Sequence, residues 1–126
     1  MSDNPYNPMV RECFSDPDHA GHVAGGAEAF FEDQGMRIRL FADVSEGHIR
    51  ELRFLARGCP HVIAATELFC RQFEGRPATD LEQFATGPIM QDLAVPVEKT
   101  GRILGLEDTV RSLRAAIQDQ QSTTQE

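Results

Sequence analysis

An alternating run of apolar and polar residues in the middle of the chain constrains the fold more than any other feature. The apolar positions are Met36, Ile38, Leu40 and Ala42 in a first run and Leu52, Phe54 and Ala56 in a second. Because successive side chains of a strand point to opposite faces, the pattern predicts two antiparallel strands, and Ser45-Glu46-Gly47 between them predicts a hairpin turn. The odd step from Ile49 to Leu52 predicts a bulge, or the true strand start, near Glu51.

Flanking segments complete an α+β fold. Alternation over residues 27–31 before a turn at 33–35 predicts another strand, and helical spacing predicts helices near 9–14 and from Cys59 to Glu74-Gly75. The capping box Thr79-Asp80-Leu81-Glu82 predicts a short helix that ends near Gly87-Pro88. Residues 89–93 allow one or two further helical turns, before an extended stretch at 94–97. The last helix is indicated by Ile103, Leu106, Val110, Leu113 and Ile117. We expect a three-stranded antiparallel sheet covered on one face by helices, in the order α-β-β-β-α-α-α.

Composition limits the class of protein. With 126 residues and a formal net charge of −8, the chain fits a single domain (1–126) with a flexible tail at 120–126, and the charge disfavours nucleic acid as a partner. Its apolar runs are far too short to span a bilayer, so no membrane association is expected. An odd number of cysteines does not describe a disulfide framework, which favours a reducing, cytoplasmic location. A monomer or a weak homodimer is expected.

The segment 54–61 contains the candidate reactive residue of the chain, a cysteine. An alternating strand runs into Gly58-Cys59 and directly out into a helix that begins at Pro60. A cysteine at a helix N-terminus lies beside unpaired backbone N–H groups and the positive end of the helix dipole, which favours its thiolate. Such a thiolate suits a metal or a sulfur transfer. The alternative is a small buried residue at a tight junction.

Several pieces of the chain, in their order and spacing, resemble the scaffold proteins of iron-sulfur cluster assembly, the IscU type that also forms the N-terminal domain of NifU. The pieces are Tyr6, Val10, Phe14, Asp16-Pro17 and Gly21, then Gly47, Arg53-Phe54 and Gly58-Cys59, then Ile63-Ala64-Ala65, Phe73-Glu74-Gly75-Arg76, Pro96-Val97 and Ile103-Leu104. The resemblance implies an IscU-like fold, an iron-sulfur cluster or an Fe or Zn ion as the bound group, and a cysteine desulfurase as a partner.

The resemblance also implies three cysteine ligands, of which this chain keeps the middle one, Cys59. The first family position falls at Glu32 or Asp33 and the third at Gly101, with Thr100 where a histidine often stands. The family's chaperone-recognition stretch is present as residues 94–99 with one proline lost and one charge reversed, which weakens the case for chaperone docking.

Other side chains of this sequence can be weighed as ligands. Cys59, His61 and a carboxylate from Glu32 or Asp33 form an S, N and O set that suits Zn²⁺ or Fe²⁺ with one open position. Alternatively, His61 points to solvent and the acidic residues are simply solvated. Cys70 lies roughly 16 Å along the helix from Cys59 and cannot share its site, whereas a contribution from Cys13 stays open.

Two functions follow, and neither is enzymatic, because no hydrolase or phosphate-loop motif is present. In the first, the protein is an iron-sulfur cluster assembly scaffold, or a sulfur or metal carrier, with Cys59 as ligand or persulfide acceptor. In the second, it keeps the scaffold fold as a protein-interaction or regulatory module without metal, since a fold does not fix a function.

Overall fold

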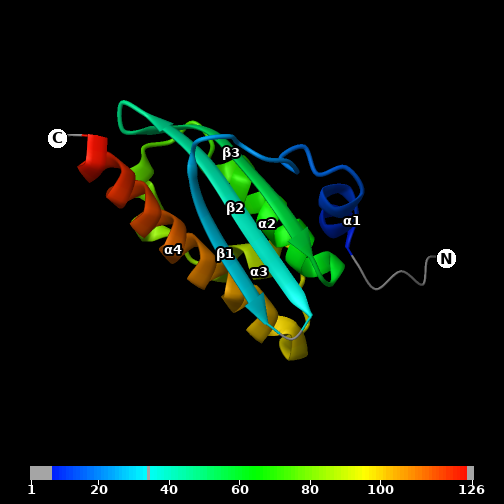
Figure 1. Cartoon of the computed structure of the whole chain (residues 1–126). Helices are drawn as coiled ribbons and strands as arrows, with labels where there is room; N and C mark the ends of the chain where they lie inside the picture. Colours follow the sequence, from blue (N-terminus) through cyan, green and yellow to red (C-terminus); the bar gives the residue numbers. More distant parts are fainter. Residues whose placement is uncertain (1–6, 34, 125–126) are drawn as a thin grey trace.

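Three antiparallel strands form a single sheet, and the long helices lie on one of its faces (Figure 1). The computed structural model describes residues 7–33 and 35–124, so Tyr6 and Gln34 lie outside the described residues. The strands are β1 (Ala27–Asp33), β2 (Met36–Ser45) and β3 (His48–Arg57), in the spatial order β1-β2-β3. The predicted α+β class and its strands are confirmed.

The β2–β3 hairpin shows why the alternation changes phase. Ser45 pairs with His48, so the loop contains only Glu46 and Gly47, with φ of 53° and 79°. Positive φ at both positions is typical of a tight hairpin turn whose twist matches the strands. The register then slips between Asp43, which pairs with Glu51, and Val44, which pairs with Ile49. The predicted irregularity beside Glu51 is therefore confirmed.

The helices cover the sheet in a simple pattern. They are α1 (Pro8–Ser15), α2 (Pro60–Phe73), α3 (Gly87–Asp92) and α4 (Thr100–Thr124), with short 3₁₀ segments η1 (Ala78–Gln83) and η2 (Val97–Lys99). The α2 helix packs on β3, α4 packs on β1 and β2, and α1 packs on the outside of α2. Asn7 caps α1 by accepting a hydrogen bond from the Val10 N–H.

The predicted end of the short helix that begins with the capping box is wrong. The η1 segment stops at Gln83, and Phe84 is extended with φ of −64° and ψ of 133°. This turn places the Phe84 ring 5.0 Å from the Phe69 ring and 5.7 Å from the Phe73 ring, between centroids. A new helix, α3, then begins where the predicted one ends, because a proline such as Pro88 is favoured in a first helical turn.

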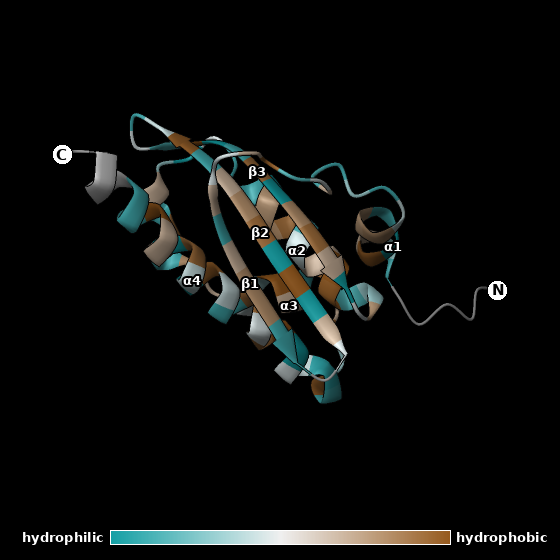
Figure 2. Cartoon of the chain, viewed as in Figure 1, coloured by the Kyte–Doolittle hydropathy of each residue, from teal (hydrophilic) through white to brown (hydrophobic). Residues whose placement is uncertain are grey.

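The core lies between the sheet and the helices α2 and α4, and Figure 2 shows apolar residues alternating along the strands. Its largest fully buried side chains are Ile38, Leu40, Ile49, Leu52, Phe54, Phe69, Ile89, Leu93, Ile103, Leu106 and Leu113. All five apolar positions predicted for the last helix are buried. The helix α4 reaches Thr124, so helical backbone enters the segment 120–126, whose flexibility stays a prediction.

The connection from α1 to β1 closes one edge of the sheet. The Phe54 N–H donates to the His19 carbonyl at 2.9 Å, and the Gly21 N–H donates to the Phe54 carbonyl at 2.8 Å. The chain then crosses to β1, and the His22 ring packs edge-on against Phe41, with centroids 4.8 Å apart. Within the described residues, no helix is long and apolar enough to cross a membrane.

Candidate functional site

Cys59 lies at the junction of β3 and α2, as the sequence predicts. It is the N-cap residue of α2, and its carbonyl accepts hydrogen bonds from the Val62 N–H at 3.0 Å and the Ile63 N–H at 3.3 Å. Gly58 before it has φ of +147°, and a Cβ there would lie 3.4 Å from the Met36 Cγ. Glycine therefore lets the chain turn tightly against β2 before the helix begins. Cys59 is half-buried at a helix N-terminus and packs partly against the core, so it is the least enclosed of the three cysteines.

The other two thiols are enclosed. Cys13 on α1 and Cys70 on α2 both have no exposed surface. Burial raises the pKa of the Cys13 thiol, and burial raises the pKa of the Cys70 thiol well above its ordinary value. Cys13 lies near the charges of Glu67 and Arg71, which are eight or more residues along α2 from Cys59, or roughly 12 Å or more. Cys13 is therefore not placed to share a ligand site with Cys59.

A hollow of about 340 Å³ lies at the same end of the molecule and is lined by Asp33, Met36, Glu98, Gly101 and Arg102. Met36 connects this hollow to the Cys59 turn, because Gly58 lies against the Met36 backbone and side chain. Asp33 and Gly101 are the candidate first and third family positions, so the structure brings these two positions together beside the Cys59 turn. Of the two carboxylates predicted for the first position, Asp33 faces this hollow.

Glu32 lies on the opposite face of the sheet. Its carboxylate accepts two hydrogen bonds from the Arg37 guanidinium, at 2.8 and 3.1 Å, and both side chains are a little less than half exposed. Because neighbouring residues of a strand point to opposite faces, Glu32 and Asp33 cannot both face the hollow.

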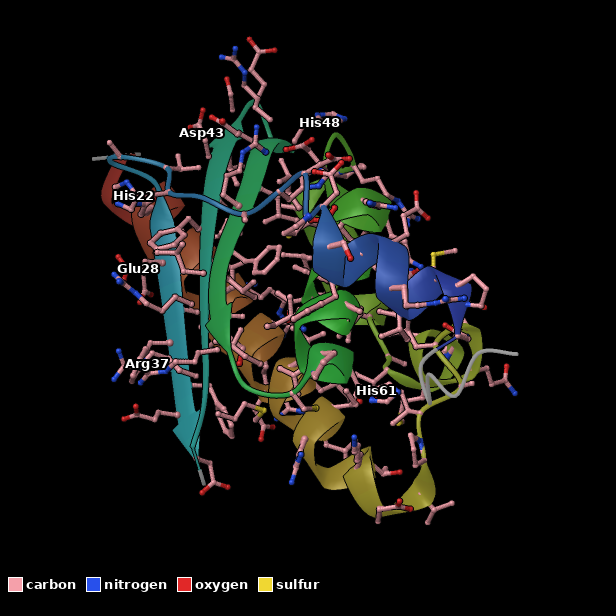
Figure 3. All side chains as sticks on the ribbon, turned by 90° about the vertical axis from the view of Figure 1, so that its right-hand side faces the viewer. His22, Glu28, Arg37, Asp43, His48 and His61 are labelled. Carbon is pink, nitrogen blue, oxygen red and sulfur yellow. The ribbon has the colours of Figure 1, made fainter. Side chains whose placement is uncertain are left out.

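His61 is buried, with 1 % of its surface exposed, so the alternative that it points to solvent is wrong. Burial lowers the pKa of the His61 imidazole, and the positive charge of Lys99 lowers it further. The ring is therefore neutral at pH 7, the form that a metal ligand requires, yet it lies inside the helical layer in Figure 3.

The donor set does not fit an iron-sulfur cluster held by one chain. Clusters are held by several thiolates, and of the three family positions only Cys59 carries sulfur, beside Asp33 and Gly101. In the part of the chain that the structure describes, no group of three or more His, Cys, Asp or Glu side chains is placed to hold a metal ion. The mixed set of Cys59, His61 and Glu32 or Asp33 therefore stays a prediction without a coordination geometry to support it.

Sequence reasoning missed two residues that line the hollow. Glu98 and Arg102 contribute a carboxylate and a guanidinium, and neither has an ion pair among the described residues. The sequence did hold a signal for them, because Glu98 and Arg102 lie on either side of Gly101, the third family position. Nearby Val97, in the stretch that corresponds to the chaperone motif, is 88 % exposed.

Comparison with known proteins agrees with this geometry. The family described as the NifU-like N terminal domain matches residues 5–125. One curated relative is the bifunctional protein NifU/MnmA of Rubrobacter xylanophilus, 29 % identical over 121 residues; the match covers 90 % of this chain and 24 % of that protein. Another is iron sulfur cluster assembly protein 1, mitochondrial, of Eremothecium gossypii, 26 % identical over 125 residues, covering 93 % and 79 %. The chain thus spans about a quarter of the first relative.

Solved structures show the same fold. A putative iron-sulfur cluster assembly scaffold protein for the SUF system from Fervidobacterium islandicum superposes with a TM-score of 0.67 at 16 % identity, covering 89 % of this chain and 96 % of that one. A nitrogen-fixing NifU-like protein (N-terminal) from Brucella abortus gives a TM-score of 0.65 at 13 % identity, covering 86 % and 94 %. At these identities the likeness concerns the fold alone.

Proposed function

This chain belongs to the NifU-like N-terminal domain family, and from that premise we propose that it carries sulfur for iron-sulfur cluster assembly by accepting a sulfane sulfur on Cys59. A cysteine desulfurase is the proposed donor. The protein acts as a carrier and not as an enzyme, in a reducing compartment such as the cytoplasm, where its thiol stays free.

The observation that carries this proposal is the contrast among the three thiols. Cys59 is only half-buried at the N-terminus of α2, whereas Cys13 and Cys70 are fully buried. A persulfide needs one accessible thiolate, while a cluster needs several sulfur ligands. The chain therefore retains what sulfur acceptance requires and lacks the donor set for cluster binding.

The proposed step balances without an added oxidant. The Cys59 thiolate attacks the terminal sulfur of the donor's cysteine persulfide, a new S–S bond forms at Cys59, and the donor's own S–S bond breaks. The donor cysteine leaves as a thiolate and takes up the persulfide's proton, so no net oxidation occurs. Arg102 beside the hollow supplies positive charge near the turn that the anionic donor must approach.

Intact mass spectrometry tests the proposal. After incubation with a cysteine desulfurase and cysteine, the wild-type chain should gain about 32 Da, one sulfur atom, and the Cys59→Ser variant should gain none. Cys13→Ala is the matched control and should be labelled as the wild type is. Equal labelling of Cys59→Ser, or an unlabelled wild type whose Cys59 still alkylates, would contradict the proposal.

A second candidate is an interaction module that binds no metal and accepts no sulfur. It is favoured by the absence, among the residues described, of three clustered metal-ligand side chains. The same mass experiment separates the two functions, because an interaction module keeps Cys59 unmodified in the presence of an active desulfurase.

A further inference from the structure

The face of the sheet that no long helix covers carries an ordered charge pattern. Outward-facing residues align in rows across the three strands according to the strand register. The first row is Glu32, Arg37 and Arg57, and the second is Phe30, Arg39 and Leu55. The third row is Glu28, Phe41 and Arg53, and its Phe41 is covered by the His22 ring and is 1 % exposed. Figure 3 shows Glu28 and Arg37 projecting to the side away from the helices.

The charges of this open face separate by strand. Both ionised groups from β1, Glu28 and Glu32, are acidic, and the groups in the same rows on β2 and β3 are arginines. Glu32 pairs with Arg37 at 2.8 Å and Glu28 pairs with Arg39 at 2.7 Å. Arg57 at the β3 edge is exposed and has no ion pair among the described residues. Within these three rows the face is therefore acidic along β1 and basic along β3, whereas the next pair, Asp43 and Glu51, is acidic, and Glu51 pairs with Arg53 at 3.2 Å.

Apolar side chains lie between the charges. Phe30 is 53 % exposed and Leu55 is 42 % exposed, and they occupy the two ends of the same row. A shallow hollow of about 190 Å³ next to Leu55 is lined by Arg37, Arg39, Ala56 and Arg57 as well. Exposed large apolar side chains framed by charges are typical of a contact surface.

We propose that the open face binds a second copy of this chain through a twofold axis that runs along β2. Rotation about that axis places β1 of one copy over β3 of the other. Each row of one copy then faces the same row of the other copy. Glu32 then meets Arg57 of the second copy, and Phe30 meets Leu55, and symmetry makes each contact twice. A twofold axis across the strands would instead oppose β1 to β1 and like charges to each other, so charge selects the first arrangement.

The arginines nearest the axis do not block this arrangement. The carboxylates on β1 draw both guanidinium groups toward β1, and the Arg37 guanidinium lies 5.7 Å from the centroid of the Phe30 ring. The patch is small compared with the roughly 20–30 residues a side of a standard interface, so the dimer is weak. Both Cys59 turns lie at the same end of the dimer, but the dimer does not depend on sulfur transfer.

Analytical ultracentrifugation with charge reversals tests this dimer. From about 10 µM to about 1 mM, the weight-average mass of the wild type should rise toward two chains, as a small interface requires. Arg57→Glu and Glu32→Arg should each weaken association about tenfold or more, because each reverses two symmetric contacts. An equimolar mixture of the two variants should recover it, since both contacts then pair opposite charges.

The matched control is Arg11→Glu on α1, which makes the same change in net charge on an exposed residue away from the open face. It should change association less than about threefold at physiological salt. Circular dichroism confirms that each variant is folded. A wild type that stays monomeric at the highest concentration, variants that associate like the wild type, or a mixture that stays dissociated would each overturn the proposal.

Discussion

The two ends of helix α2 are built in opposite ways. In the C-terminal half, Glu67 is fully buried and accepts hydrogen bonds from the His19 N–H at 2.9 Å and from Arg71 at 2.8 Å, with the His19 ring 2.7 Å away. Glu74 accepts from the Leu52 N–H at 2.9 Å and from Arg53 at 2.7 Å. At the N-terminal end, Cys59 is half-buried and makes no side-chain capping bond.

The difference separates a part of α2 that stabilises the fold from a part that can take part in a reaction. Buried charges persist only when they are paired and hydrogen-bonded, so the Glu67 end joins α2, the α1–β1 connection and β3 into one unit. A reactive thiol needs access and few competing bonds, and Cys59 is the least buried of the three cysteines and makes no capping bond. The same helix thus anchors the fold at one end and presents a thiol at the other.

Removal of the buried carboxylate should have the largest effect. Glu67→Ala leaves Arg71 and His19 without their shared acceptor, and we expect a loss of about 3 kcal/mol in the free energy of unfolding. Urea denaturation followed by circular dichroism measures it. The control is Glu82→Ala, an exposed glutamate with no ion pair among the described residues, which should cost less than about 0.5 kcal/mol. Equal losses would contradict the importance of the network.

At the other end, Gly58→Ala should cost about 1–2 kcal/mol. The residue has φ of +147°, which strains any residue with a side chain, while the added Cβ would only contact the Met36 Cγ, at 3.4 Å. Gly87→Ala is the control, because a Cβ there meets no atom within 4 Å and φ is not positive. Thermal unfolding of both variants gives the comparison, and a neutral Gly58→Ala would show that the Cys59 turn tolerates other geometries.

Acid should weaken the two ends in separate pH windows. Burial and Lys99 lower the pKa of His61 below 6.5, so its contribution to stability is present above pH 6.5 and is lost as the pH falls through the folded-state pKa. For Glu74, burial would raise the pKa, but hydrogen bonds from Leu52, His19 and Arg53 outweigh it and lower the pKa below 4.5. Its contribution is therefore lost only below about pH 4.5.

The difference between the stability curves of wild type and His61→Phe, measured by urea denaturation from pH 4 to 8, isolates the first window. We expect a slope of at most about 1.4 kcal/mol per pH unit from one group, present in the wild type and absent in the variant. Identical slopes for the two proteins near pH 6 would show that His61 does not titrate differently on folding.

Cys59→Ser should have the smallest effect on stability, within about 0.5 kcal/mol, because the side chain is half-buried and makes no capping bond. Its effect on reactivity should be complete. A thiol reagent added to native wild type should modify one cysteine per chain rapidly, and none in the variant. Rapid modification of Cys13 or Cys70 in the native protein would contradict their burial.

Much of the fold could be predicted from the sequence because periodicity reports which side of an element is buried. The strands around Gly47 and the apolar positions of α4 follow from local spacing alone. Local spacing alone does not show that Glu67 is buried, because its partner His19 becomes available only when the α1–β1 connection docks on α2. Similarly, the two possible first ligand positions, Glu32 and Asp33, were separated only by the faces of the folded sheet.

By itself, the sequence determined the order of helices and strands, the Gly58-Cys59 turn before a helix, and the presence of one cysteine where the family pattern has three. These features depend on residue identity and local geometry. The tertiary structure decided which two cysteines are enclosed, that His61 is buried, and that Asp33 and Gly101 share a hollow beside the Cys59 turn. Those facts depend on packing between segments that are distant along the chain, which no local pattern encodes.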